Sequence, residues 1–383
     1  MIKCKNCQAE FNNNGSVNFC PRCGAKFESF QYAGSVESRQ NNYTHNTYQA
    51  NGKQTSDYDW KNFKKDADEK IRNAFNLDKI ENFNLSEFLG QIFKKHPWAE
   101  IEEYLITGTP STTPPLSAIS TLWPTPWLFF RMILITVLAV LFLYWKLDFF
   151  GVNNVFMPLL IFGVIGIPMA TLIFFWELNV PKNVSMLLLV RIMLISGFLS
   201  IGITFIMHSL IGMDDSWSAV WAGPIEETAK TLTMLFFLKN SRYCYKLNGL
   251  LIGAAVGTGF AFIESGGYTI SELMIGGDPD FTMILRALLS PFCHIPWSAI
   301  VGAALWRTMQ YKVWNIENLL NRKFLSLFFF SIGMHMFWNS SLLESNLPIK
   351  AAIVGGLEYT IIVYLLQEGI NEIRQLKSAA SNA

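Results

Sequence analysis

The stretch WSAVWAGPIEETAKTLTMLFFL, residues 217–238, is apolar enough to cross a bilayer, yet it carries Glu226, Glu227 and Lys230 near its middle. About 20 apolar residues in a helix span the hydrocarbon of a membrane. A charge at the centre of such a helix costs roughly 2.5–3.5 kcal/mol on insertion scales, so ionisable groups there face protein or water rather than lipid. The stretch therefore predicts a membrane helix that contributes to a polar functional site.

The rest of the chain supports a membrane protein. Its 383 residues are 51% hydrophobic and only 15% charged, which is far to the apolar side of soluble proteins. We predict an all-α polytopic fold, and the net charge of +1, with no clustered basic residues, predicts no nucleic-acid partner. Eight transmembrane helices are expected, at about 125–145, 154–176, 185–211, 217–238, 248–270, 281–305, 324–343 and 349–367.

Basic residues in the short loops predict the orientation. With the N-terminus in the cytoplasm, the inner loops and the tail hold ten lysines and arginines, against Lys146 and Lys350 outside. Both termini are therefore expected in the cytoplasm, with the lipid bilayer as the first partner. Arg286 is the one basic residue that does not fit this pattern cleanly.

Four of the six cysteines lie in the first 23 residues, in two Cys-x-x-Cys pairs. Two such pairs can present four thiolates to a tetrahedral zinc ion, and we predict a structural zinc ribbon over residues 1–28. Two disulfides are the alternative, which the cytoplasmic orientation disfavours. A closed site supports folding or docking rather than catalysis, so a cytoplasmic regulator is its expected partner. The predicted ligands are Cys4, Cys7, Cys20 and Cys23.

The segments outside the ribbon and the membrane domain are predicted from their composition and the spacing of apolar residues. Residues 29–57 are rich in Asn, Gln, Ser and Thr without apolar periodicity, which predicts a disordered linker. Helical spacing of apolar residues predicts a cytoplasmic helical module at 58–108, whose faces pack on one another, lie on the membrane or bind a partner. A proline-rich lead-in at 109–124 precedes the membrane domain, 125–370, and a short tail, 371–383.

Four predicted helices carry ionisable side chains in their interior: Glu226, Glu227, Lys230, Glu264, His294 and His335. At about 1.5 Å of rise per residue, four of these groups fall between mid-membrane and the outer third, within reach of one another: Glu226, Glu264, His294 and His335. Their insertion costs on the order of 10 kcal/mol unless they meet, so we predict one shared polar cavity.

Local spacing refines this prediction. Lys230 lies three and four residues after the two carboxylates, so it can neutralise one while the other faces the cavity. Pro224 begins or kinks its helix, and Pro291 and Pro296 are expected to break the helix on both sides of the histidine between them. Gly253 and Gly257 are spaced for close helix packing. Taken singly, each polar residue also fits a structural role as an interhelical hydrogen-bond partner.

The order of these motifs resembles a known family. Glu226-Glu227-Thr-Ala-Lys230 (EExxK), Phe260-Ala-Phe-Ile-Glu264 (FxxxE), an isolated His294 and His335-x-x-x-Asn339 (HxxxN) resemble the PrsW-type intramembrane proteases, relatives of the CAAX prenyl endopeptidases and the CPBP proteins. The resemblance covers roughly residues 125–370. It implies a bacterial inner-membrane protease that cuts a single-span protein from the outer side, in the best-known case an anti-sigma factor in a stress response.

The resemblance also implies roles for the residues. Glu226 would be the principal catalytic carboxylate, positioned by Glu227 and Lys230, with Glu264 and His294 completing water activation. His335 and Asn339 match the residues that hold the oxyanion in the CAAX relatives. Those relatives carry a histidine where Glu264 stands, so their water-activating pair does not transfer unchanged. Zinc held by Glu264, His294 and His335, with Glu226 as the base, is the alternative to metal-independent glutamate chemistry.

Two other classes of function use the same residues. Intramembrane carboxylates also mark ion pathways, so a proton- or cation-coupled transporter is one alternative. The sequence contains no convincing internal repeat of the kind that many transporters show. An inactive scaffold that binds membrane proteins through the cavity is the other alternative.

Overall fold

The computed structural model describes residues 2–3, 10–11, 60–150, 162–212, 215–237, 243–309 and 315–381. The chain divides into two compact units, Met1–Tyr58 and Asp59–Ala383. In the first unit, strand β1 (Ile2–Lys3) pairs with the antiparallel strand β2 (Glu10–Phe11). The four cysteines of the predicted zinc ribbon and the predicted linker, 29–57, lie outside the described residues, so both stay predictions.

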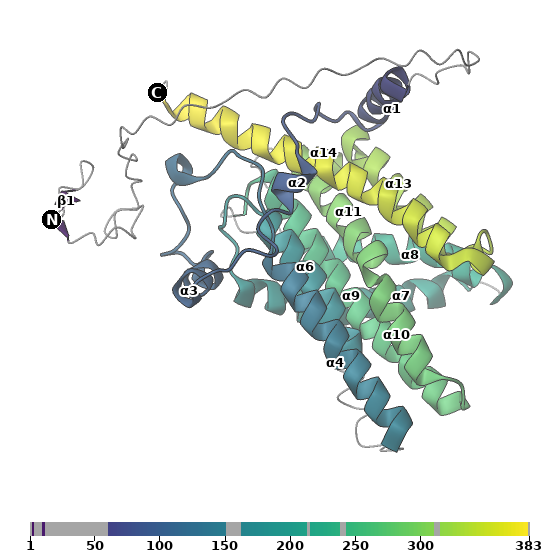
Figure 1. The fold of residues 1–383 in the computed structure, drawn as a ribbon. Helices are drawn as coiled ribbons and strands as arrows, with labels where there is room; N and C mark the ends of the chain where they lie inside the picture. Colours follow the sequence, from purple (N-terminus) through teal and green to yellow (C-terminus); the bar gives the residue numbers. More distant parts are fainter. Residues whose placement is uncertain are drawn as a thin grey trace, which may run out of the picture. The chain divides into compact units, whose positions relative to one another are not determined.

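The second unit is a bundle of helices, as the sequence predicts (Figure 1). Its elements along the chain are α1 (Trp60–Phe75), α2 (Leu85–Phe88), α3 (Trp98–Ile106), η1 (Leu116–Ala118), α4 (Leu128–Phe150), η3 (Phe162–Gly166), α6 (Ile167–Leu178), α7 (Met186–Ile211), α8 (Asp215–Leu235), α9 (Lys246–Ile275), α10 (Pro279–Leu289), η4 (Ser290–Phe292), α11 (His294–Met309), α12 (Ile316–Leu320), α13 (Arg322–Asn339), η5 (Glu344–Asn346) and α14 (Leu347–Ser381).

Described helices overlap each of the eight predicted crossings, and five of the described segments are long and apolar enough to cross a membrane. A sixth apolar segment, Phe162–Leu178, is shorter. The count of eight crossings therefore stays a prediction, although the helical fold is confirmed. The five segments are Leu128–Lys146, Met186–Ile211, Lys246–Ile275, Pro279–Met309 and Glu344–Ser381.

Helices α9 and α11 form the centre of the bundle, where they lie side by side (Figure 1). Glycines explain how closely they approach. A Cβ atom on Gly257 would collide with the backbone oxygen of His294, and Gly253 meets α11 in the same way one turn earlier. On another side of α9, Gly259 and Gly197 bring α7 equally close. The predicted glycine pair thus allows close helix packing, as expected, and it fixes His294 against α9.

The helix is interrupted just before His294. Helix α10 ends at Leu289, a 3₁₀ turn covers Ser290–Phe292, and Cys293 has φ −133° and ψ −122° before α11 starts. Pro291 therefore lies in the break, as the sequence predicts. The expectation for Pro296 is wrong, because it sits in the first turn of α11, where a helix needs no backbone N–H donor.

Helix α8 is continuous through Pro224, so this proline does not begin the helix. A proline inside a helix leaves backbone groups without their usual partner. The Thr228 hydroxyl donates to the Pro224 carbonyl oxygen at 2.7 Å. Gly223 lies against α13, since an added Cβ would come within 2.9 Å of Met336 Cγ. This part of α8 therefore combines a residue without a backbone N–H donor and a close neighbour on α13, directly before Glu226.

The N-terminal helices α1–α3 pack on the bundle rather than mainly on one another. Leu77, Phe88 and Ile119 are buried in the same hydrophobic cluster as the membrane helices. Polar contacts reinforce this docking. Arg307 of α11 donates to the Asn76 carbonyl oxygen at 2.6 Å. On α14, Tyr364 contacts Asp68, Gln367 contacts Glu81, Asn371 contacts Asp78, and Arg374 contacts Thr121. The part of α14 from Tyr364 onwards, which includes the end of its predicted crossing and the turns beyond it, provides the surface for this docking.

Candidate active site

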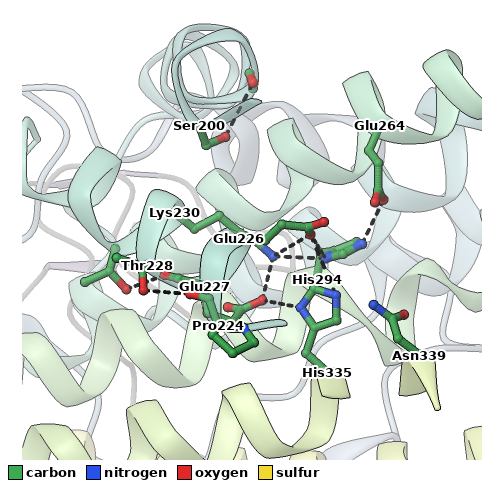
Figure 2. A network of polar contacts seen from close by, with 12 residues as sticks. Ser200, Pro224, Glu226, Glu227, Thr228, Lys230, Glu264, His294, His335 and Asn339 are labelled. Carbon is green, nitrogen blue, oxygen red and sulfur yellow. Dashed lines mark hydrogen bonds and ion pairs between the residues drawn. The ribbon is translucent and has the colours of Figure 1, made fainter. Parts of the chain in front are cut away.

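The seven residues predicted for the site lie together on four helices. Helix α8 carries Glu226, Glu227 and Lys230, α9 carries Glu264, α11 begins at His294, and α13 carries His335 and Asn339. Figure 2 shows the two imidazoles between the acidic groups of α8 and Glu264, with Asn339 nearby. The predicted convergence of these helices is therefore present in the structure.

Lys230 is fully buried and pairs with one of the two adjacent carboxylates. Its Nζ lies 2.6 Å from Glu227 Oε1 but 3.9 Å from Glu226 Oε2. The ammonium also lies 4.2 Å from the centre of the Phe260 ring, in a cation–π contact. The lysine thus neutralises Glu227, which leaves Glu226 as the carboxylate that faces the cavity.

His294 is held from both sides. Its Nε2 lies 2.9 Å from Glu264 Oε2, and its Nδ1 lies 3.0 Å from Lys230 Nζ. Because a lysine ammonium only donates, Nδ1 is the acceptor and Nε2 carries the proton that Glu264 accepts. Arg286 contacts the same Glu264 carboxylate and lies 3.3 Å from Ser265 Oγ through its Nε. This ion pair accounts for the arginine that the loop pattern left unexplained.

One ring nitrogen of His335 likewise contacts a carboxylate. Its Nδ1 lies 3.0 Å from Glu227 Oε1, which accepts the proton of that nitrogen. Its Nε2 then carries a lone pair and points towards Glu226 Oε2, 3.7 Å away. Two acceptors face each other there, so a proton, a water or a cation between them would stabilise the arrangement.

Glu226 is a buried member of this network that also lines the adjoining cavity. The residue is 7% exposed, and its Oε2 has no hydrogen-bond partner in the described part of the chain. Three carboxylates meet the cations of Lys230 and Arg286, which leaves one negative charge when both imidazoles are neutral. An additional positive species beside Glu226 would therefore balance the buried group.

A metal ion fits this position. Ligand atoms of Glu226, His294 and His335 lie within 4.8 Å of one another. The zinc set predicted from the sequence, with Glu264 in place of Glu226, is wrong on this point, because Glu264 binds the far nitrogen of His294. Each histidine instead donates its other ring N–H to a carboxylate, as metal-bound histidines usually do.

The group opens into a cavity of about 360 Å³. Its lining includes Glu226, His294, His335, Glu264 and Asn339. The Asn339 amide donates one N–H to the Ala219 carbonyl oxygen at 2.8 Å, which leaves its second N–H for a ligand. The cavity can therefore admit water and a polar chain to the carboxylate and the imidazoles.

Trp297 and Glu358 form a layer behind His335 that the sequence did not reveal. The indole of Trp297 stacks on the imidazole of His335, with ring centres 4.4 Å apart and planes 23° apart. Its Nε1–H donates to Glu358 of α14, whose side chain is fully buried. The sequence signal was available, because Glu358 is a lone carboxylate within the predicted last crossing.

A comparison with known families supports the interpretation of the motifs. Residues 180–367 match the family model described as PrsW family intramembrane metalloprotease. The match includes the helices α7 to α13 and most of the apolar part of α14, and thus every residue of the site. No curated protein and no solved structure matches the chain.

Proposed function

Over residues 180–367 the chain belongs to the PrsW family of intramembrane metalloproteases, and from this premise we propose that it cleaves a membrane-anchored protein inside the bilayer. Intramembrane endopeptidase activity is what the family indicates. The observation that carries the proposal is the Glu226 carboxylate oxygen, which has no hydrogen-bond partner among the described residues. It lies beside two imidazoles whose far ring nitrogens contact carboxylates.

The donor set suits a divalent cation such as zinc. Glu226 Oε2, His294 Nδ1 and His335 Nε2 would hold the ion, and the three protein ligands would leave a coordination position for water. When bound, the metal would supply Lewis acidity and lower the pKa of its water. Glu264 and Glu227 would fix the tautomers of the two histidines so that the correct nitrogens face the ion.

One observation favours the metal-free alternative. Lys230 donates to the same nitrogen, His294 Nδ1, that a metal would use. In that form Glu226 would take a proton from a water in the cavity and return it to the leaving amine. Lys230 would keep Glu227 charged so that Glu226 alone exchanges protons. In both forms the free N–H of Asn339 would donate to the carbonyl oxygen of the scissile bond as negative charge develops.

The substrate proposed here is a single-span protein, of which an anti-sigma factor in a stress response is one example. The positions of the charged loops support cleavage from the outer half of a bacterial inner membrane, with both termini in the cytoplasm. The motif Cys4-x-x-Cys7 with Cys20-x-x-Cys23 supports a structural zinc ribbon that receives a cytoplasmic regulator.

The proposal is tested by the substitution Glu226→Gln, which keeps the shape of the side chain and removes its charge and basicity. We expect shed ectodomains to disappear from cells that carry this variant, while the protein still captures its substrate. Glu103→Gln, an exposed acid on α3, is the control and should cleave normally. Persistent cleavage by the Glu226 variant would refute the assignment, and proton flux through liposomes without substrate would favour a transporter.

The zinc content of the protein distinguishes the metal-dependent mechanism from the metal-free glutamate mechanism. If the membrane site binds zinc, the full chain holds one more equivalent of zinc than the Glu226→Gln variant. Cys4→Ser together with Cys7→Ser should remove a different equivalent, the one in the ribbon. Equal zinc in the parent and in the Glu226 variant would leave the glutamate form as the mechanism.

A further inference from the structure

A second polar cavity lies at the other end of the helices that carry the candidate active site. Its volume is about 90 Å³. Along α11, Arg307 is thirteen residues from His294, which is about 20 Å at the rise of an α-helix. Helices α9 and α13 also run from this cavity towards Glu264 and His335. The lining residues are Asn76, Asp78, Lys246, Arg307, Lys323 and Glu368.

Arg307 is the most deeply buried of the three cations that line this second cavity. It is only 7% exposed, and its Nη1 has no hydrogen-bond partner in the described ranges. The other donors are in use: Nε lies 2.8 Å from Glu368 Oε2, and Nη2 donates to Glu368 Oε1 at 3.0 Å and to the Asn76 carbonyl oxygen at 2.6 Å. A buried guanidinium donor without a partner destabilises a protein, which indicates a missing acceptor.

The charges around the cavity favour an anion. Glu368 is already paired with Arg307, and the carboxylate of Asp78 accepts a hydrogen bond from Asn371 at 3.0 Å. Lys323 is exposed and has no ion pair with any described residue, and Lys246 reaches Glu368 only at 4.0 Å. Two lysines and the guanidinium therefore outweigh two occupied carboxylates.

A larger cavity of about 300 Å³ adjoins this one and shares Asn76 and Lys323 with it. Its other lining groups are mainly polar and include Asn73, Arg322 and Ser326. The two cavities together suit a ligand with a small anionic end and a polar remainder. At about 30 Å³ per water in the liquid, the smaller one has room for only a few waters or one compact anion.

We propose that the smaller cavity binds the phosphate group of a phosphate monoester, with Arg307, Lys246 and Lys323 as the anchoring cations. Arginine and lysine donors are the usual partners of phosphate oxygens. The polar remainder of the ligand occupies the adjoining cavity. This inference does not depend on proteolysis.

The position of the site gives the ligand a structural role. Asn76 and Asp78 belong to the segment that follows α1, whereas the three cations belong to α9, α11 and α13. A phosphate held there contacts both, so it stabilises the docking of the N-terminal helices on the bundle. The ligand is either a soluble phosphate monoester or the headgroup of phosphatidic acid, which share this chemistry.

Thermal unfolding of the full chain in detergent tests the proposal, with inorganic phosphate, glycerol 3-phosphate or short-chain phosphatidic acid added at constant ionic strength. We expect a saturable rise of the midpoint temperature with at least one of them. Lys323→Gln should raise the half-saturating concentration about tenfold, because it removes one charged donor. Lys65→Gln, an exposed lysine of α1 outside both cavities, should leave it unchanged.

The results distinguish a soluble ligand from a lipid headgroup and test the proposal itself. A response to the soluble phosphates supports a soluble ester, and a response to phosphatidic acid alone supports a lipid headgroup. No saturable response to any of the three probes would overturn the proposal. An equal response from Lys323→Gln and from the parent chain would overturn it as well, because the Lys323 ammonium has no ion pair with a described residue whose loss could mask the effect.

Discussion

The contact between Glu358 and Trp297 leads to a specific prediction, because Glu358 of α14 affects the site only through Trp297. Glu358 is fully buried, and Trp297 Nε1–H donates to it. Its second oxygen has no partner among the described residues. Trp297 is itself fully buried and stacks on the imidazole of His335. Glu358→Leu would therefore leave a buried indole N–H without an acceptor.

The size of the effect follows from that contact. An unsatisfied buried donor costs about 1–3 kcal/mol, so the free energy of unfolding should fall by this amount. The indole would no longer be fixed beside His335, and a displacement of about 1 Å in a catalytic group costs up to a hundredfold in rate. We expect cleavage by Glu358→Leu to fall by tenfold to a hundredfold in kcat, with KM for the substrate little changed.

The matched variant is Glu358→Gln, which keeps a carbonyl oxygen as acceptor and removes the charge. It should retain both stability and cleavage. The assay is cleavage of a single-span reporter in liposomes, together with denaturant unfolding followed by tryptophan fluorescence. Wild-type cleavage by Glu358→Leu would refute the reasoning. A Gln variant as poor as the Leu variant would show that the charge, rather than the acceptor, matters.

The remaining predictions concern packing and metal affinity. Gly257→Ala should destabilise the protein by about 1–3 kcal/mol and reduce cleavage, because the added Cβ would push His294 away from α9. Gly266→Ala on the same helix is the control. Its Cβ would meet nothing within 4 Å, so thermal unfolding should be unchanged. Equal effects of the two would contradict the close approach of α9 and α11. Glu264→Gln should weaken zinc binding at the membrane site about 10–100-fold in chelator competition, because the His294 N–H loses its charged acceptor. Glu272→Gln, also on α9 but outside the site, should bind zinc like the parent chain, and a similar loss there would argue against a specific role of Glu264.

The sequence by itself determined the helical membrane fold and indicated which polar side chains come together in the bundle. Long apolar runs leave little choice but helices, because backbone groups in lipid must bond within their own segment. Charges within such runs are costly, so Glu226, Lys230 and Glu264 had to meet one another or other polar groups. The spacing of Lys230 after Glu226 and Glu227 also predicted that it pairs with one of them, because such a pair depends only on local geometry, whereas the structure decided that the partner is Glu227.

Only the tertiary structure decided which atoms face one another. Whether Glu264 or Glu226 joins the two histidines depends on the rotation of α9 and α8 about their axes, which the glycine contacts of α9 with α11 and of α8 with α13 set. Helix spacing predicts a face but not its partner across the bundle. The docking of α1 on α11 and α14, and the acid Glu358 behind Trp297, depend in the same way on contacts between residues far apart in the chain.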